Sequence, residues 1–136
     1  IRGGTLRRGL SKSCGCYAAE VKKRIRKQDA PFIDVFRKVK QAAAKRNIPF
    51  ALTLDNIKDL VLKDCYYCGV SPSNTDKRLL RIHNFYYNGI DRVDNTQGYI
   101  INNCVPCCSF CNTIKSTKTQ QAFFQHIKLL YHRHCL

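Results

Sequence analysis

The chain has 136 residues, of which 44% are hydrophobic, so it can build one modest core but not two large domains. Its 24 lysines and arginines outnumber its 9 acidic residues, and the formal net charge of +15 excludes a protein that is indifferent to polyanions. No apolar run approaches the roughly 18 residues that a membrane-spanning helix needs, so an integral membrane protein is excluded as well.

The first 30 residues are expected to form a basic arm with a partial cysteine module, and residues 31–136 a second domain. A helix is predicted over residues 17–28. The density of positive charge in this arm predicts contacts with nucleic-acid phosphates rather than a merely solvated surface. The candidate contacts are Lys22, Lys23, Arg24, Arg26 and Lys27.

The start of the chain carries two further signals. It begins with isoleucine and contains no methionine, so we expect a processed product or the loss of an original N-terminus.

Cys14 and Cys16 have the spacing of half of a second zinc site. Its other half would come from upstream residues, which we favour, or from His132, His134 and Cys135.

Two helices are predicted between the arm and the first cysteine pair. Pro31 opens a helix that runs to about Arg46, with a stripe of apolar residues at helical spacing. Thr53 is a suitable N-cap for a second helix over residues 54–62. The residues expected to face the core are Phe32, Val35, Phe36, Val39 and Ala43 on the first helix and Leu54, Ile57, Leu60 and Val61 on the second.

The second half of the chain is predicted to contain a hairpin followed by two helices. Residues 70–84 are polar and are expected to form a loop. Strands are predicted over residues 86–93 and 99–101, around a turn that composition indicates at residues 94–98. Helices are expected over about 108–115 and 119–132, and the last of them would bury Phe123, Ile127, Leu130 and Tyr131.

Nine cysteines, an odd number, argue against a fully paired disulfide scaffold. Two C-x-x-C pairs, Cys65 with Cys68 and Cys108 with Cys111, have the spacing by which two tight turns supply the four thiolates of a structural zinc. Gly69 suits the positive φ of such a turn. The alternative is a set of unrelated buried or redox cysteines. A zinc thiolate site predicts an intracellular, reducing compartment. Cys104 and Cys107 form an offset pair, which we interpret as small packing residues.

The segment between and after these pairs resembles the HNH endonucleases, a family with a ββα-metal (His-Me finger) motif. The resemblance lies in D-R-V-D-N-T-Q-G-Y at residues 91–99 and in C-S-F-C-N-T-I-K at residues 108–115, and it is closest to phage and bacterial HNH proteins. It extends over residues from about 32 to 132. It implies an α+β fold, a small zinc-stapled ββα-metal core with flanking helices.

The resemblance also implies an activity, the metal-dependent hydrolysis of DNA phosphodiester bonds. By position in the motif, Asp91 and Asn112 would hold a catalytic Mg²⁺ or Mn²⁺ ion, and Asn103 matches the middle asparagine. Asn112 could instead brace its helix, and Asp91 could pair with an arginine. Lys115, which ends the motif, joins the expected nucleic-acid contacts.

Arg92 departs from the family pattern, because it stands where the best-known members carry the general-base histidine. A guanidinium group stays protonated and cannot accept a proton from water. It can bind the phosphate or stabilise charge in the transition state. The base is therefore expected elsewhere, with His83 as the first candidate and Tyr86 and Tyr87 as the others.

A second hypothesis is a non-catalytic protein that keeps the HNH fold for its charge and zinc-braced shape. It would act as a structural nucleic-acid-binding subunit, for example of a ribosome or another RNA–protein particle. The missing histidine, the basicity and the methionine-free start permit this interpretation. Nucleic acid is the expected partner under both hypotheses, with DNA favoured over RNA, and a homodimer or an RNA–protein particle is the expected assembly. The expected compartment is a bacterial or phage-infected cytoplasm or an organelle matrix.

Overall fold

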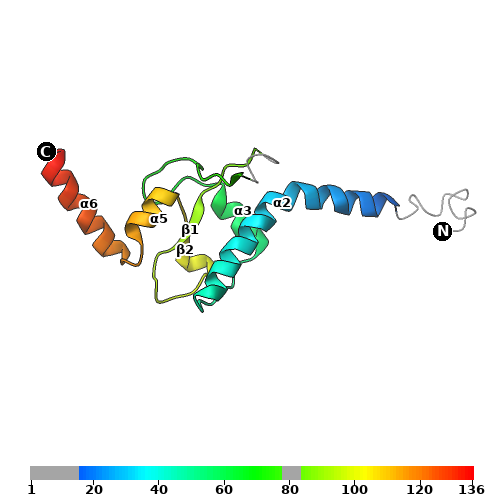
Figure 1. Cartoon of the computed structure of the whole chain (residues 1–136), viewed down its shortest axis with the longest axis horizontal. Helices are drawn as coiled ribbons and strands as arrows, with labels where there is room; N and C mark the ends of the chain where they lie inside the picture. Colours follow the sequence, from blue (N-terminus) through cyan, green and yellow to red (C-terminus); the bar gives the residue numbers. More distant parts are fainter. Residues whose placement is uncertain (1–15, 78–83) are drawn as a thin grey trace, which may run out of the picture. The chain divides into compact units, whose positions relative to one another are not determined.

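A computed structural model describes residues 16–77 and 84–136 of the chain (Figure 1). The chain divides into two units, Ile1–Pro31 and Phe32–Leu136. Within the described residues no helix is long and apolar enough to cross a membrane. Cys14 and His83 lie outside the described residues, as do the side chains of Cys16 and Arg26.

Helix α2 runs over Cys16–Lys45 and includes Pro31, where we predicted that one helix ends and another begins. That prediction was wrong. A proline removes one helical hydrogen bond, but its fixed φ near −65° is itself helical, so the chain can continue through it. The described basic side chains on the first part of this helix are exposed, namely those of Lys22, Lys23, Arg24 and Lys27.

Helix α3, Leu54–Val61, begins where the sequence predicted. The Thr53 hydroxyl accepts a hydrogen bond from the N–H of Asn56 at 3.2 Å, and the Asn56 side-chain oxygen accepts one from the N–H of Thr53 at 2.9 Å. This reciprocal pair is a capping box and satisfies two backbone donors at the start of the helix.

Strands β1 (Gly89–Arg92) and β2 (Cys104–Cys107) form a two-stranded antiparallel sheet in which Asp91 lies opposite Val105. Helix α3 contacts both strands, and α5 (Ser109–Lys115) contacts β1. Figure 1 shows the hairpin between these two helices. The chain thus follows the predicted order of strand, strand and helix.

The second strand lies further along the chain than residues 99–101, where we predicted it. Tyr99 donates its N–H to the carbonyl of Pro49 at 2.8 Å and accepts from the N–H of Ala51 at 2.9 Å, so it pairs with the segment between α2 and α3. Ile101–Asn103 forms a short 3₁₀ helix, η1. The apolar run at 99–101 was misassigned because its partner is this distant segment and not β1.

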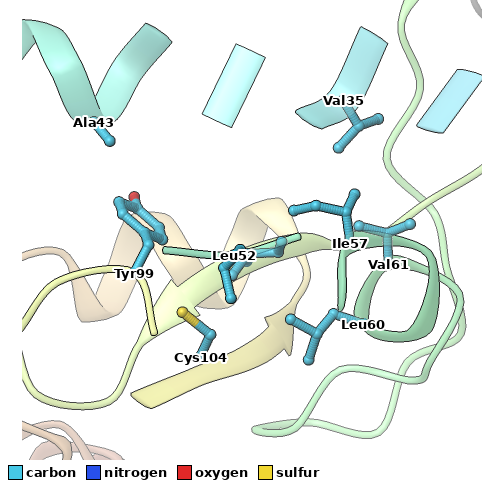
Figure 2. Packing of buried hydrophobic residues seen from close by; sticks show 9 residues of the cluster. Val35, Ala43, Leu52, Ile57, Leu60, Val61, Tyr99 and Cys104 are labelled. Carbon is cyan, nitrogen blue, oxygen red and sulfur yellow. The ribbon is translucent and has the colours of Figure 1, made fainter. Parts of the chain in front are cut away.

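The core lies between α2, α3 and the hairpin. Val35 and Ala43 on α2 are buried and face residues of α3 and the aromatic ring of Tyr99 (Figure 2). This confirms the predicted stripe on α2. The cluster consists of Val35, Ala43, Leu52, Ile57, Leu60, Val61, Ile90, Tyr99 and Cys104, with Phe32, Phe36 and Val39 among the half-buried residues that pack against it.

Helix α6, Gln120–His134, begins after Thr119 and buries Phe123, whose ring centroid lies 5.4 Å from that of Tyr67. The prediction that Ile127, Leu130 and Tyr131 are also buried was wrong, because they are 40%, 45% and 54% exposed. In the described part of the chain, the aromatic contacts between α6 and the core are made from its first turn, by Phe123 and its neighbour Phe124.

Candidate metal centre and active site

Four cysteine side chains from two distant turns converge on one point. The sulfur atoms of Cys65, Cys68, Cys108 and Cys111 all lie within 4.8 Å of one another. Those of Cys68 and Cys108 are 3.8 Å apart, which is close to the edge of about 3.8 Å in a tetrahedron with Zn–S bonds of about 2.3 Å. The predicted convergence is confirmed, and the donor set fits a zinc ion.

Backbone hydrogen bonds shape both turns. Gly69 has a φ of 74° and donates its N–H to the carbonyl of Cys65 at 2.8 Å, while the N–H of Cys111 points at the sulfur of Cys108 at 3.4 Å. Burial works to raise the pKa of the Cys65 thiol, but hydrogen bonds from the backbone of Cys108, Cys68 and Tyr67 outweigh it and lower the pKa to about 6. A lowered pKa favours the thiolate form of Cys65, and the thiolate is the metal ligand. Burial and the neighbouring thiols raise the pKa of Cys111, and the pKa of Cys68 is raised as well, so binding of a metal there would release protons.

Cys104 and Cys107 are packing residues, as predicted, and stand outside the four-sulfur cluster. Cys104 belongs to the hydrophobic core, and burial raises the pKa of its thiol to about 11. Cys107 is fully buried beside the cluster and donates to the carbonyl of Cys108 at 3.4 Å. Burial raises the pKa of Cys107 too, so both thiols stay protonated near neutral pH.

A cavity of about 210 Å³ lies beside the hairpin. It brings together three of the predicted site residues, Asp91 and Arg92 on β1 and Asn112 on α5. The remaining residues of its wall are Arg46, Ile90, Asn95, Tyr99, Ser116 and Thr117. A carboxylate, two amides and two guanidinium groups therefore share one small space.

Asp91 is buried and held by two donors on the same oxygen. Its Oδ2 accepts from the Tyr67 hydroxyl at 2.7 Å and from the Lys115 ammonium at 2.9 Å. Burial and the neighbouring Asp91 raise the pKa of Tyr67, so the phenol remains a donor. Within the described residues Oδ1 of Asp91 makes no hydrogen bond, and Asp91 lines the cavity.

Lys115 is fully buried and also donates to the carbonyl of Arg92 at 3.0 Å. The expectation that it contacts nucleic acid was wrong, because its ammonium is enclosed by Asp91 and the backbone of β1. The partner of Asp91 is this lysine and not an arginine, the alternative that the sequence left open. Lys115 thereby ties α5 to β1, the two elements that carry the candidate metal ligands.

Arg92 shapes the turn that follows β1. Its Nη1 donates to the carbonyl oxygens of Asn95 at 3.0 Å and Gln97 at 2.7 Å. Asp94 accepts from the N–H and hydroxyl of Thr96 and from the Gln97 amide. These hydrogen bonds, with a smaller contribution from Arg92, lower the pKa of the Asp94 carboxyl. Hydrogen bonds from the Arg92 side chain and to the Asp94 side chain therefore both hold the turn in place.

Asn103 is buried behind this turn and does not line the cavity. Its side-chain oxygen accepts from the N–H of Asp94 at 2.9 Å, and its amide donates to the carbonyls of Asp94 and Gly98 at 2.9 and 3.1 Å. This arrangement braces the turn. Asn112, by contrast, is exposed at the cavity wall.

The described residues do not supply a histidine base at the cavity. His126, His132 and His134 all lie on α6, and none of them lines it. Tyr86 and Tyr87 are also absent from its wall. His83 therefore stays a prediction.

Sequence reasoning gave no role to three residues that the structure brings to the site: Arg46, Tyr67 and Tyr99. Tyr67 lies within the first C-x-x-C pair and Tyr99 ends the D-R-x-D-N-x-x-G-Y pattern, so both were visible in motifs. Arg46 lies 45 residues before Asp91 in the chain, and no local pattern connects the two.

Comparison with protein families and with curated proteins gives a partial match. No family model matches the chain. The uncharacterized protein R423 of Acanthamoeba polyphaga mimivirus is 37% identical over 90 residues, which are 66% of this chain and 15% of that relative. The chain therefore spans a small part of the curated relative that it matches.

The rare-cutting HNH restriction endonuclease PacI has a similar structure. The TM-score is 0.54 at 22% sequence identity, and the match covers 77% of this chain and 82% of PacI. With the hairpin, the helices and the four-cysteine cluster, this likeness confirms the predicted α+β fold class. The chain has an HNH-like fold.

Proposed function

We propose that this chain is a metal-dependent endonuclease that hydrolyses DNA phosphodiester bonds. The observation that carries the proposal is the cavity shared by Asp91, Arg92 and Asn112, in a fold whose four-cysteine cluster includes Cys111, the residue before Asn112. The likeness to an HNH restriction endonuclease and the net charge of +15 support it. The exposed basic side chains on the first part of α2 would add sequence-independent affinity for phosphates.

The cavity suits a hard divalent cation. Oδ1 of Asp91 and the side-chain oxygen of Asn112 would be its protein ligands, and such oxygen donors are those that Mg²⁺ and Mn²⁺ prefer. Lys115 and Tyr67 hold Oδ2 and so fix the carboxylate with its other oxygen free. A bound ion would stabilise the negative charge that develops on the phosphate and the leaving oxygen.

Proton transfer needs a group other than Arg92, whose guanidinium remains charged. His83 is the proposed general base, with Tyr86 and Tyr87 as alternatives. Asn103 is proposed to act through the turn that it braces, by keeping Asp91 and Arg92 at their places on β1.

The test is the nicking of supercoiled plasmid by zinc-loaded protein, with and without added Mg²⁺ or Mn²⁺. Asn112→Ala is expected to lower the nicking rate at least ~100-fold, because it removes a ligand of the ion. Thr113→Ala is the matched control, since Thr113 is the next residue on α5, is exposed and does not line the cavity. Equal rates for the two variants would contradict the proposal.

A second function, nucleic-acid binding without cleavage, is favoured by one observation. Asp91 is already ion-paired with the fully buried Lys115, and this pairing weakens the attraction of the carboxylate for a cation. In that case the wild-type protein would not nick DNA with either metal, yet would bind RNA or DNA with an affinity that falls steeply with salt.

A further inference from the structure

Two arginines from distant parts of the sequence meet around the side chain of Tyr99. Arg46 follows the last residue of α2, and its Nη2 donates to the Tyr99 hydroxyl at 2.8 Å. The guanidinium carbon of Arg92 lies 5.3 Å from the centroid of the Tyr99 ring, within the range of a cation–π contact. All three residues line the cavity that holds Asp91 and Asn112.

Tyr99 is a rigid support for both guanidinium groups. It is buried, and its backbone is hydrogen-bonded to Pro49 and Ala51 on the segment between α2 and α3. Gly98 permits this close approach, because a Cβ at that position would lie 2.6 Å from the carbonyl oxygen of Pro49. The two arginines are therefore positioned before any ligand arrives, which reduces the entropy lost on binding.

Both guanidinium groups keep donors for a ligand. Arg92 uses Nη1 for the carbonyls of the turn, and Arg46 uses Nε for the carbonyl of Ala42 and Nη2 for Tyr99. Within the described residues, Nε and Nη2 of Arg92 and Nη1 of Arg46 make no hydrogen bond. A guanidinium offers five N–H donors, so each of the two arginines keeps several for a ligand.

Beside the proposed cation ligands, the two arginines of the cavity wall favour an anion. The carboxylate of the wall, that of Asp91, is paired at 2.9 Å with the Lys115 ammonium beneath it. The carboxylate of Asp94 is directed to Thr96 and Gln97 in the turn. Arg46 and Arg92 are thus two positive charges that share a small space, and neither forms an ion pair with an acid in the described part of the chain.

We propose that Arg46 and Arg92 form a clamp for one phosphate group of the nucleic-acid backbone, and that Tyr99 positions them. The planar N–H pairs of arginine match the oxygens of a phosphate, and two of them can grip it from different sides. The inference rests on the proposed function in that the bound phosphate is the one to be cleaved. It assigns substrate binding to Arg46, which lies outside the hairpin and α5.

The test compares Arg46→Ala with Lys45→Ala, which removes the same charge one residue earlier from an exposed position off the cavity wall. Fluorescence anisotropy with a short DNA duplex, without divalent metal, gives the affinity at several salt concentrations. Arg46→Ala is expected to weaken binding about tenfold and to lower the slope of log K against log salt by about 1, as for one lost phosphate contact. Lys45→Ala should change the slope less.

Tyr99→Phe tests the positioning role, because it keeps the ring under Arg92 and removes the hydroxyl that holds Arg46. In Tyr99→Phe the slope of log K against log salt should stay near the wild-type value, because Arg46 keeps its charge. Plasmid nicking should slow about as much as in Arg46→Ala, because the Arg46 guanidinium is no longer held in position. A nicking rate equal to that of wild type would overturn the role of Tyr99.

The clamp itself is overturned if Arg46→Ala and Lys45→Ala have the same salt slope and affinity. Melting temperatures of the three variants separate this result from a general loss of fold. Failure of the wild-type protein to nick DNA would refute the proposed cleavage, but the difference in salt slope between Arg46→Ala and Lys45→Ala would still decide whether the clamp binds phosphate.

Discussion

Replacing Cys111 with serine is expected to remove one zinc ion per chain and to abolish the cooperative unfolding of the core. Cys111 is one of four sulfurs within 4.8 Å of one another that join the turn before the hairpin to α5. Structural zinc sites contribute about 10–16 kcal/mol in small peptides, as much as or more than the ~5–15 kcal/mol by which whole domains are stable. A small hydrophobic core is not expected to compensate for that loss.

Cys104→Ser is the matched control for this variant. Cys104 and Cys111 are both 6% exposed, but Cys104 lies in the hydrophobic core and outside the sulfur cluster. The control should keep its zinc, and its free energy of unfolding should fall by only ~1–3 kcal/mol because a hydroxyl is buried without a partner. Zinc content by elemental analysis and thermal unfolding by circular dichroism check the pair. Equal zinc content and equal melting temperatures in the two variants would contradict a four-cysteine site.

Replacing Lys115 with methionine is expected to destabilise the fold by about 3–5 kcal/mol, the cost of leaving one partner of a buried ion pair alone. Lys115 is 0% exposed and Asp91 6%, so the carboxylate that remains has lost its ion pair and regains little solvation from water. Methionine replaces most of the lysine stem, so the loss comes from the charge and not from a cavity. Urea unfolding with zinc present throughout measures the change.

Lys118→Met is the matched control, because Lys118 is exposed and lies three residues after Lys115. This substitution should change the free energy of unfolding by less than ~0.5 kcal/mol. Combining Lys115→Met with Asp91→Asn removes both charges together. This double variant should be less destabilised than the sum of the two single variants by about 1–3 kcal/mol. Strict additivity would show that the two charges do not interact.

Features that depend on a few neighbouring residues were predictable from the sequence. The N-cap at Thr53 depends only on the first turn of its helix, and the turn at Gly69 requires only the preceding C-x-x-C pair. The convergence of the four cysteines followed from their two spacings and the chemistry of zinc. The order of strand, turn, strand and helix followed from composition and local pattern along the chain, and the resemblance agreed with it.

Features that depend on distant partners were not predictable. The return strand was misplaced because Tyr99 pairs with the segment around Phe50, and neither residue signals the other locally. The apolar face of α6 has the spacing of a core helix although most of it is exposed. Proline is common at the first position of a helix, yet Pro31 lies inside α2.

The same reason limits prediction of the site. Asp91, Arg92 and Asn112 were found through the motif and do share a cavity. The burial of Lys115 was not predictable from the sequence, because a lysine is buried only where a distant residue such as Asp91 pairs with it in the folded chain. Arg46 was missed as a site residue because its link to Arg92 passes through Tyr99, a contact that exists only in the folded chain.

Titration of zinc-loaded protein with Mn²⁺, followed by ¹⁵N NMR, tests most directly whether Asp91 and Asn112 hold a divalent ion in the cavity. Paramagnetic Mn²⁺ broadens signals close to it. The side-chain amide of Asn112 and the backbone amides of Asp91 and Arg92 should broaden first, and the same β1 amides should need far more Mn²⁺ in Asn112→Ala. Broadening that spares these signals, or that is unchanged in Asn112→Ala, would contradict a metal-dependent nuclease site at this position.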